Sequence, residues 1–561
     1  MAVWEKRTNW VISQVSRTDW TAQDVYYGLE HSFQYSANIN TDDEMHGIKL
    51  ANEPAHTNSY AQCQLVSLWE NGVMALPATL SSTPQRFEYT GSSWSSKNSN
   101  AWPSTWVGSI KTCPWVVFQD YFWYWGSSGS TWNSGIVKVD PKSTTSWWNF
   151  ALFVPQDHLD STDESISTPT TWPMAPLVWT VTAILNYNNT RLVVACWTDI
   201  WVYYPELDQW LESWDIYYWR TWWKKVLSYE AWVTIVALTC TFEYLKVWAV
   251  DEWWNTKVYY YQWNNNLRDT FVYNVIDLTG EKVLRVYSIN SIDYFITSID
   301  WTDGYVNLNK MVWNVPVQLF HQRAGLDPLD VNYKAPYFVW PVWINAAYKS
   351  GRFYIADSYG VFQFKYTPQS FDEWYMKWKL SNSTREVYGV CENKGFLYVS
   401  DEDWCWAMRL YDTGVDGYQS NWVLISREYE WKEWWTLTKM LDEVRLNFEL
   451  NPNTSNVWTI DVYVSPNNLW KSTSSFTESN GRYHAMSITS NSKWTRTEKS
   501  NLLNNMWNSS KSSFANMWDW QTITYAIVMK QSTSTHATPI VRQIDLRYHV
   551  KDKTNNVYDI N

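Results

Sequence analysis

The stretch Arg191–Tyr204, RLVVACWTDIWVYY, contains the unit that decides the fold of this chain. Residues 191–196 form a short apolar run rich in β-branched side chains, and residues 201–204 predict a second strand after a tight connection. The same pattern recurs, so a β-hairpin is the repeated element. Its further copies are FYIADSYGVFQF (Phe353–Phe364), LYVSDEDWCWAMRLY (Leu397–Tyr411), LKVWAVDEWWNTKVYYY (Leu245–Tyr261) and YFITSIDWTDGYVNL (Tyr294–Leu308).

The spacing of these hairpins predicts a β-propeller. Corresponding strands lie about 45–55 residues apart, which is the length of a blade of about four strands. A single blade cannot bury both of its faces, whereas blades packed around an axis can, and ring closure removes long exposed sheet edges. We therefore expect an all-β fold with a propeller over residues 58–420. About seven blades fit, and six or eight would survive a shift of boundary.

The two ends of the chain differ from this repeat. Residues 1–57 are polar and poorly periodic, which predicts an extended N-terminal arm or an edge strand; such an arm can also dock on a neighbouring subunit. Residues 421–440 are interpreted as a linker, and residues 441–561 as an antiparallel β-sandwich with Asn/Ser-rich loops, such as 470–480 and 493–516. Little helix is expected. The expected sandwich strands are Val444–Leu450, Thr459–Ser465, Tyr483–Thr489, Thr522–Met529 and Val541–Val550.

The connections between strands contain an unusual residue. Tight turns favour Gly, Asn or Asp because some turn positions need a positive φ, which a large side chain resists. Here they carry tryptophan, and glycine makes up only 18 of 561 residues, where about 7% is usual. The turn tryptophans are Trp197, Trp301, Trp404 and Trp253-Trp254, with further doublets at Trp147-Trp148, Trp222-Trp223 and Trp434-Trp435.

We hypothesise that most of the 45 tryptophan codons are UGA, which the source organism reads as glycine. Restoring glycine would suit a turn-rich β protein. The alternative is a truly tryptophan-rich, carbohydrate-binding surface. UGG codons at the turn positions would end the hypothesis. Six tryptophans sit where an aromatic side chain fits a strand and are expected to be genuine: Trp94, Trp123, Trp248, Trp378, Trp406 and Trp520.

Composition restricts the partners and the compartment. The net charge is −12 and there is no basic run, which argues against direct nucleic-acid binding. The N-terminus lacks the apolar segment of a signal peptide, and the apolar run Val233–Val250 is interrupted by Glu243 and Lys246, which argues against a membrane span. The cysteines have no metal-binding spacing and are expected to be buried free thiols; they are Cys63, Cys113, Cys196, Cys240, Cys391 and Cys405.

A search for catalytic motifs finds none. Walker A, GxGxxG, HExxH and GxSxG patterns are missing from the sequence, and the eight histidines are scattered. We therefore predict no catalytic, cofactor-binding or metal-binding residues, no cofactor, and no enzyme activity. A propeller channel could still gather paired carboxylates for glycoside hydrolysis. The recurring aspartates are interpreted as turn residues whose carboxylates bind backbone N–H groups; they are Asp199, Asp251, Asp300, Asp357 and Asp401.

The last part of the chain resembles a known class of proteins. The segments Thr459–Asn468 (TIDVYVSPNN), Trp518–Thr533 (WDWQTITYAIVMKQST) and Ala537–Val550 (ATPIVRQIDLRYHV) are similar to the C-terminal endings of bacteriophage tail and tail-fibre-associated proteins. Residues 424–450 resemble the link between a propeller and such a sandwich. The likeness covers roughly residues 412–561, and the propeller matches in architecture only. Tail nozzle proteins of short-tailed phages also contain propellers, and reassigned codes occur in a few bacterial lineages and their phages.

This resemblance implies a non-enzymatic virion structural protein, namely a tail component made in the host cytoplasm. It would contact other virion proteins and form a homo-oligomeric ring, with no nucleic acid bound and no membrane span. One alternative is a module that binds a glycan or receptor on the host surface. Another is a carbohydrate-active propeller enzyme. The aromatic residues expected to contact a glycan are Tyr463, Tyr483, Tyr525 and Tyr548.

Overall fold

A computed structural model shows a chain built almost entirely of β-strands, as the sequence predicts. The helical elements among the described residues are two three-residue 3-10 turns, η2 (Trp69–Asn71) and η3 (Pro205–Leu207). The structure describes residues 9–14, 33–40, 48–57, 60–77, 84–96, 104–105, 114–127, 134–142, 150–153, 181–207, 209–213, 216–220, 223–241, 244–263, 270–278, 280–289, 291–298, 305–312, 314–323, 345–349, 352–356, 360–365, 373–379, 387–410, 417–419, 421–426, 429–430, 437–449, 458–466, 483–489, 495–501, 522–531 and 538–552.

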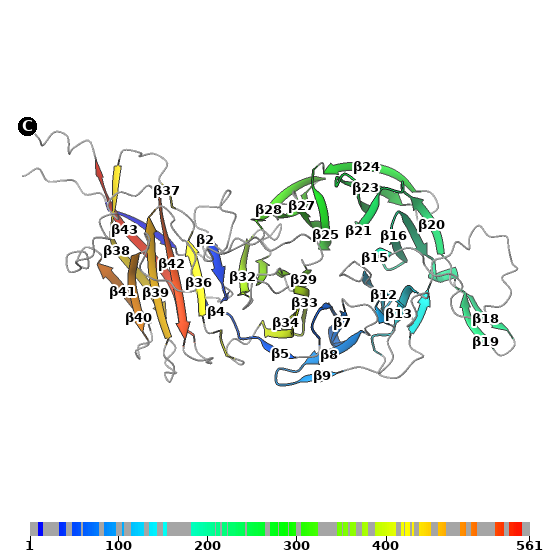
Figure 1. Cartoon of the computed structure of the whole chain (residues 1–561), viewed down its shortest axis with the longest axis horizontal. Helices are drawn as coiled ribbons and strands as arrows, with labels where there is room; N and C mark the ends of the chain where they lie inside the picture. The colour runs from blue at the N-terminus through cyan, green and yellow to red at the C-terminus, as the bar shows by residue number, and fades with distance from the viewer. Residues whose placement is uncertain are drawn as a thin grey trace, which may run out of the picture.

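Seven antiparallel sheets, blades 1 to 7, are arranged around a ring at one end of the molecule (Figure 1). Six of them are formed by strands close together in sequence, and the seventh borrows a strand from the N-terminal segment. Blade 1 consists of β6 (Cys63–Ser67), β7 (Val73–Pro77), β8 (Gln85–Tyr89) and β9 (Trp94–Ser96). Blade 2 consists of β10 (Ser104–Thr105), β11 (Trp115–Phe118), β12 (Tyr121–Ser127), β13 (Ser134–Val139) and β14 (Phe150–Phe153). Blade 3 consists of β15 (Val181–Tyr187), β16 (Arg191–Cys196), β17 (Asp199–Tyr203) and β20 (Trp223–Ser228).

Blades 4 to 7 repeat the four-stranded pattern. Blade 4 consists of β21 (Thr234–Cys240), β22 (Tyr244–Val250), β23 (Thr256–Trp263) and β24 (Thr270–Leu278), and blade 5 of β25 (Lys282–Ile289), β26 (Ile292–Ser298), β27 (Tyr305–Val312) and β28 (Val315–Arg323). Blade 6 consists of β29 (Asn345–Lys349), β30 (Arg352–Ala356), β31 (Gly360–Lys365) and β32 (Glu373–Lys379). Blade 7 consists of β33 (Val387–Asn393), β34 (Phe396–Asp401), β35 (Cys405–Arg409) and β5 (Ala55–Thr57).

The blades share their irregularities as well as their strands. The first strands of blades 3, 4, 5 and 7 each have a register shift close to their beginning. The outer strands of blades 3 to 6 each have another against the preceding strand. A β-bulge increases the local twist and interrupts the ladder of hydrogen bonds. Its recurrence at matching places indicates one repeated unit, and on the outer strands it protects the sheet edge from pairing with other chains.

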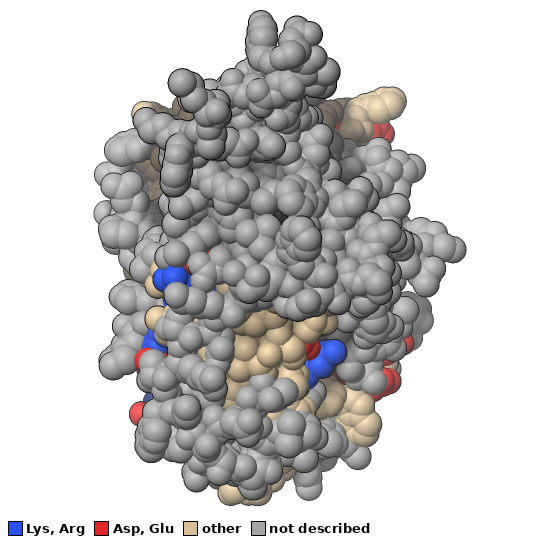
Figure 2. Space-filling model, turned by 90° about the vertical axis from the view of Figure 1, so that its left-hand side faces the viewer, with Lys and Arg blue, Asp and Glu red and all other residues tan. Residues whose placement is uncertain are grey.

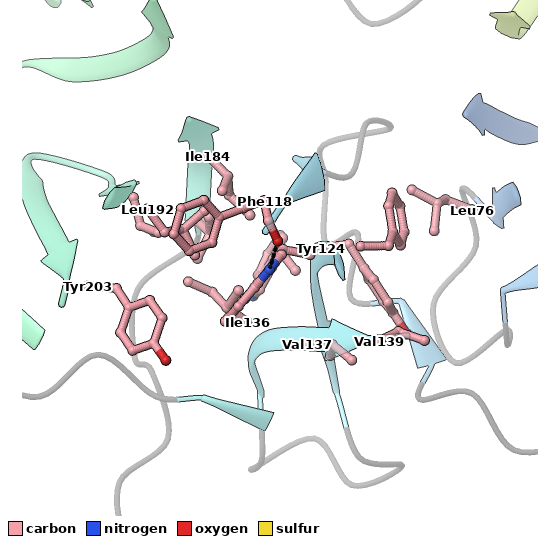
Figure 3. Packing of buried hydrophobic residues seen from close by; sticks show 14 of the residues in the cluster. Leu76, Phe118, Tyr124, Ile136, Val137, Val139, Ile184, Leu192 and Tyr203 are labelled. Atoms are coloured by element: carbon pink, nitrogen blue, oxygen red, sulfur yellow. Dashed lines mark hydrogen bonds between the residues drawn. The ribbon is translucent and has the colours of Figure 1, made fainter. Parts of the chain in front are cut away.

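The apolar core of the ring lies between the blades. One cluster joins blades 1, 2 and 3, with Leu76 and Tyr203 on opposite sides of side chains from β11, β12 and β13 (Figure 3). Further clusters are shared by blades 3 and 4, 4 and 5, 6 and 7, and 7 and 1. In these clusters neighbouring sheets bury their faces against each other, which is the reason that the blades fold as a ring.

The C-terminal domain is a sandwich of two antiparallel sheets. One sheet has the order β1 (Asn9–Gln14), β43 (Ile540–Asp552), β38 (Leu437–Glu449) and β41 (Thr495–Asn501). The other has the order β2 (Phe33–Ala37), β36 (Asn421–Ser426), β42 (Thr522–Gln531), β39 (Trp458–Pro466) and β40 (Tyr483–Thr489), and β37 (Tyr429–Glu430) also pairs with β42. The five strands expected in this domain are all present.

Three parts of the sequence interpretation differ from the structure. Residues 421–440 supply β36, β37 and the beginning of β38 to the sandwich, because their backbone groups pair with β42 and β43 rather than forming a free linker. Strand β41 lies within the expected loop 493–516; its polar sequence TRTEKSN lacks apolar alternation, and pairing with β38 specifies the strand instead. An additional hairpin, β18 (Gln209–Ser213) with β19 (Ile216–Arg220), is inserted in blade 3. The expected loop 470–480 lies outside the described residues.

The N-terminal segment connects the two domains. Strand β1 pairs with β43 and β2 with β36, so each occupies an edge of a sandwich sheet. The short strands β3 (Ile39–Asn40) and β4 (Lys49–Leu50) pair with each other, and β5 then pairs with β35 as the outer strand of blade 7. These strands use their own chain as partner.

Candidate functional site

The seam between blades 7 and 1 closes the ring. Ser400 on β34 accepts a hydrogen bond from the backbone N–H of Cys63 at 2.9 Å and donates one to the carbonyl of Tyr60 at 3.0 Å. The backbone N–H of Gln62 donates to the carbonyl of Asp401 at 2.8 Å. Because Ser400 is fully buried, its hydroxyl joins the two blades in a place that water does not compete for.

The same seam contains further polar contacts and one required glycine. Asn393 donates to the carbonyl of Gly72 at 2.6 Å, and the hydroxyl of Tyr398 accepts from the N–H of Tyr89 at 3.2 Å. A Cβ at Gly389 would lie 2.4 Å from the carbonyl oxygen of Cys63, so only glycine allows strands β33 and β6 to approach this closely. The seam is thus held by specific hydrogen bonds in addition to its aromatic cluster.

The N-terminal segment fastens the sandwich to this seam. Asn52 donates to the carbonyl of Arg409 in blade 7 at 2.6 Å, and Asn38 donates to the carbonyl of Asn421 in the sandwich at 3.1 Å. Ile48, which is fully buried, bridges to Val541 of β43. A single segment therefore touches the closing blade and both sandwich sheets.

A buried ion pair joins blades 4 and 5. The Nζ atom of Lys246 on β22 lies 2.6 Å from Oδ2 of Asp293 on β26, and the side chains are 7% and 0% exposed. Oδ1 of Asp293 is buried without a hydrogen-bond partner. Sequence reasoning missed this pair, although a single charge inside each of two otherwise apolar strands was an available signal. Such a pair contributes little net stability but is costly to break, because removing one partner leaves the other charge buried and uncompensated.

The predicted turn role is confirmed for Asp251 and Asp401 and is wrong for Asp199, which lies at the beginning of strand β17 and binds side chains. Oδ1 of Asp251 accepts from the N–H groups of Trp253 and Asn255, both at 2.9 Å. Asp401 accepts from the backbone of Asp403 and Trp404 and from the indole of Trp406. Asp199 instead accepts from the hydroxyl of Ser228 at 2.6 Å. Asp300 and Asp357 lie outside the described residues.

The two proposed glycan-contacting tyrosines whose side chains the structure describes are buried. Tyr463 is 6% exposed and Tyr525 is 1% exposed, so both contribute to the core of the sandwich rather than to a binding surface. Tyr463 packs against His484 with ring centroids 5.0 Å apart. The side chains of Tyr483 and Tyr548 lie outside the described residues. The sequence of strands β39 and β42 did not indicate which face of the sheet Tyr463 and Tyr525 occupy.

The five cysteines that the structure describes are free thiols, as predicted, and four of them are buried. Cys63, Cys196, Cys391 and Cys405 are buried, Cys240 is half-buried, and Cys113 lies outside the described residues. Burial raises the pKa of the Cys63 thiol to about 12, which keeps it protonated and unreactive. Within the described ranges, no group of three or more His, Cys, Asp or Glu residues is arranged to hold a metal ion.

The innermost strands of the ring are poor in carboxylates. Along the described strands β6, β10, β11, β15, β21, β25, β29 and β33, the one acidic residue is Glu392. Glycoside hydrolysis uses a pair of carboxylates flanking the scissile bond. The described inner strands bring no such pair together.

The tryptophans fall into two structural groups. Trp69, Trp197 and Trp254 have positive φ values of 50°, 59° and 67°. By contrast, Trp123 and Trp248 are buried, and their indole N–H groups donate to the carbonyl of Phe118 and to the hydroxyl of Thr239. Trp94 and Trp406 also pack in strands as expected, whereas the side chains of Trp378 and Trp520 lie outside the described residues.

Two of the suspected turn tryptophans behave differently. Trp223 is fully buried at the beginning of β20 and stacks on Tyr203 with centroids 5.0 Å apart, because strand β20 starts there rather than a turn. Its indole nitrogen is buried without a hydrogen-bond partner. Trp404 lies in a turn, but its φ is not positive. Trp147, Trp148, Trp222, Trp301, Trp434 and Trp435 lie outside the described residues.

One face of the sandwich end carries only scattered charges among its described residues (Figure 2). Figure 2 shows single Lys, Arg, Asp and Glu residues around an uncharged area there, rather than a basic patch. No helix in the described part of the chain is long and apolar enough to cross a membrane.

Comparison with known proteins identifies no family. No family model matches the chain, and no curated protein matches it. Among solved structures, it is similar to the WD40 β-propeller domain of Doa1 (TM-score 0.37, 9% identity), covering 64% of this chain and 97% of that one. It is also similar to an exo-β-1,3-galactanase from Phanerochaete chrysosporium (TM-score 0.25, 9% identity), covering 80% of this chain and 99% of that one. A third similar structure is a putative 6-phosphogluconolactonase from Bacteroides uniformis (TM-score 0.33, 11% identity), with 60% of this chain and 92% of that one covered. These likenesses carry no argument about activity.

Proposed function

We propose that this chain is a non-enzymatic structural protein of a bacteriophage virion, a tail component that acts through protein–protein contacts in a ring assembly. The observation that carries the proposal is the N-terminal segment that closes blade 7 and also pairs with both sandwich sheets. It pairs its backbone with both domains, which suits a part that transmits force through protein–protein contacts. The likeness of residues 412–561 to the endings of phage tail proteins supports the same role.

An antibody raised against the whole chain tests the proposal. Immunogold labelling of purified virions should place the protein on the tail, and the label should be lost when the antibody is first absorbed with the purified chain. A protein present in infected cells but missing from particles would refute the structural role.

We also propose that Trp69, Trp197 and Trp254 are glycine in the protein that the source organism makes. Their positive φ supports this, because a left-handed backbone costs a bulky residue about 1–2 kcal/mol and glycine almost nothing. Peptide mass spectrometry of protein purified from the source should find glycine at all three positions and tryptophan at Trp248. Tryptophan at the three turn positions, encoded by UGG, would overturn the proposal.

A further inference from the structure

The chain passes between the ring and the sandwich twice, and the two passages are hydrogen-bonded to each other. Residues 51–53 follow the segment that bridges to β43 and lead to β5 of blade 7, and residues 417–419 lead from blade 7 to β36. They pair antiparallel through a bridge between Asn52 and Tyr418. On either side of this bridge, a backbone N–H of one passage donates to a carbonyl of the other at 3.0 Å. We call residues 51–53 and 417–419 the tie.

Side chains of both domains are bonded to the tie. On the sandwich side, Nε2 of Gln531 on β42 donates to the carbonyls of Tyr418 at 3.1 Å and Gln419 at 2.7 Å. On the ring side, Nδ2 of Asn52 donates to the carbonyl of Arg409, the last residue of β35, at 2.6 Å. Within the tie, the side chain of Gln419 donates to the carbonyl of Asn52 at 3.4 Å. The hydrogen bonds therefore continue without a break from β42 of the sandwich to β35 of blade 7.

The tie is shielded from water. Asn52, Tyr418, Gln419 and Gln531 are each at most 9% exposed. A buried hydrogen bond is costly to lose, because water does not replace the missing partner. Each passage is also a backbone partner of the other, so release of residues 417–419 from the sandwich removes bonds that hold residues 51–53. Opening at one end of the tie is therefore expected to reach the other end.

We propose that the tie transmits local opening between the sandwich and the closing blade of the ring. Strand β5 is only three residues long, so few hydrogen bonds of its own hold it on β35. Loss of the sandwich contacts of the tie would release β5 and expose the edge of blade 7. Such coupling is reciprocal, since both ends act on one equilibrium. The inference concerns how the two domains are joined and does not depend on the virion role.

Hydrogen–deuterium exchange of the full-length chain, read by mass spectrometry of its peptides, tests this inference. The variant Gln531→Ala should speed exchange in β35 about tenfold, because two buried carbonyls of the tie lose their donor. Exchange in β23 of blade 4, on the side of the ring away from the sandwich, should not change (Figure 1). The matched control Lys530→Ala alters the exposed neighbour on β42 and should leave β35 as in the unmodified chain.

The variant Asn52→Ala tests the coupling from the ring side. It removes the hydrogen bond to the carbonyl of Arg409 and should speed exchange around Val541, whose N–H donates to the carbonyl of Ile48 in the sandwich. Circular dichroism shows whether each variant folds.

Two results would overturn the inference. In a folded Gln531→Ala variant, faster exchange confined to residues 417–419, with β35 unchanged, would show that opening stops within the tie. An equal change in β35 in the Lys530→Ala control would show that any substitution on β42 has the same effect. If Gln531→Ala does not fold, Asn52→Ala decides alone, and unchanged exchange around Val541 would then refute the coupling.

Discussion

The interiors of the blades and the connections between their strands use the same residue in opposite ways. Trp248 fills the space between blades 4 and 5, where its ring packs at a tilt against Phe295 with centroids 5.1 Å apart and its N–H donates to Thr239. Trp253, at the end of the same hairpin, is 77% exposed, and Trp254 beside it has a φ of +67°. An indole stabilises the fold at the interior site, whereas in the connection it contributes no buried contact or strains the backbone. The same residue type is therefore needed for folding at one position and not at the other.

The largest effect should come from the interior. The variant Trp248→Gly removes a fully buried side chain, leaves a cavity between the blades and places a glycine inside a strand. The free energy of unfolding should therefore fall by about 5 kcal/mol. Denaturant titration followed by circular dichroism measures it. The matched variant Trp253→Gly, five residues away and exposed, should change stability by no more than about 0.5 kcal/mol. Equal losses in both variants would abolish the distinction between the two regions.

The ion pair between blades 4 and 5 is a second interior test. Asp293→Ala leaves the ammonium of Lys246 buried without its partner and should cost about 3 kcal/mol. Adding Lys246→Met should recover most of the loss, because an apolar side chain of similar length replaces the unpaired charge. The same denaturant titration serves for both variants. A double variant as unstable as Asp293→Ala alone would show that the pair does more than satisfy its own charges.

The connections should respond in the opposite direction. Trp197→Gly and Trp254→Gly each relieve a left-handed backbone and should raise stability by about 1 kcal/mol. Trp197→Ala is the control, since it removes the indole but keeps the Cβ that conflicts with positive φ. Differential scanning calorimetry should show a higher unfolding temperature for the glycine variant than for the alanine variant. Equal temperatures would mean that φ at this position is not the source of strain.

The sequence predicted the architecture because each blade is specified by features of short, continuous segments. Alternating strands, turn signals and constant spacing are each visible in segments such as LKVWAVDEWWNTKVYYY. The seam between blades 7 and 1 could not be predicted, since Ser400 and Cys63 meet only after the chain has gone around the ring. Strands such as β41 depend on pairing rather than pattern, and the burial of Tyr463 depends on which face of a sheet is covered. The exposure of Tyr273 on β24 likewise depends on which sheet edge is left uncovered, which strand periodicity alone does not give.

The pKa of Lys282 provides a test of the connection that contains Trp254. Its ammonium lies over the ring of Trp254, 3.2 Å from the centroid, and burial lowers the pKa of Lys282 from 10.5 to about 8. A depressed lysine pKa means that the unfolded chain holds more protons between those values, so stability rises with pH across that interval. In Trp254→Gly the pKa should move back toward 10.5 and this rise should flatten. Carbon-detected NMR of the lysine side chains measures the pKa; a value that stays near 8 would show that other groups bury Lys282.

The smallest effect should be at Trp404, which separates backbone strain from mere location in a turn. Trp404 occupies a connection like that of Trp254, but its backbone is not left-handed, and its N–H already donates to Asp401 at 2.7 Å. Trp404→Gly therefore gains no relief of strain and adds freedom to the unfolded chain, so stability should fall by about 0.5 kcal/mol. Calorimetry beside Trp254→Gly makes the comparison direct. A gain at Trp404 equal to that at Trp254 would mean that exposure of the indole, rather than the sign of φ, is what the turns resist.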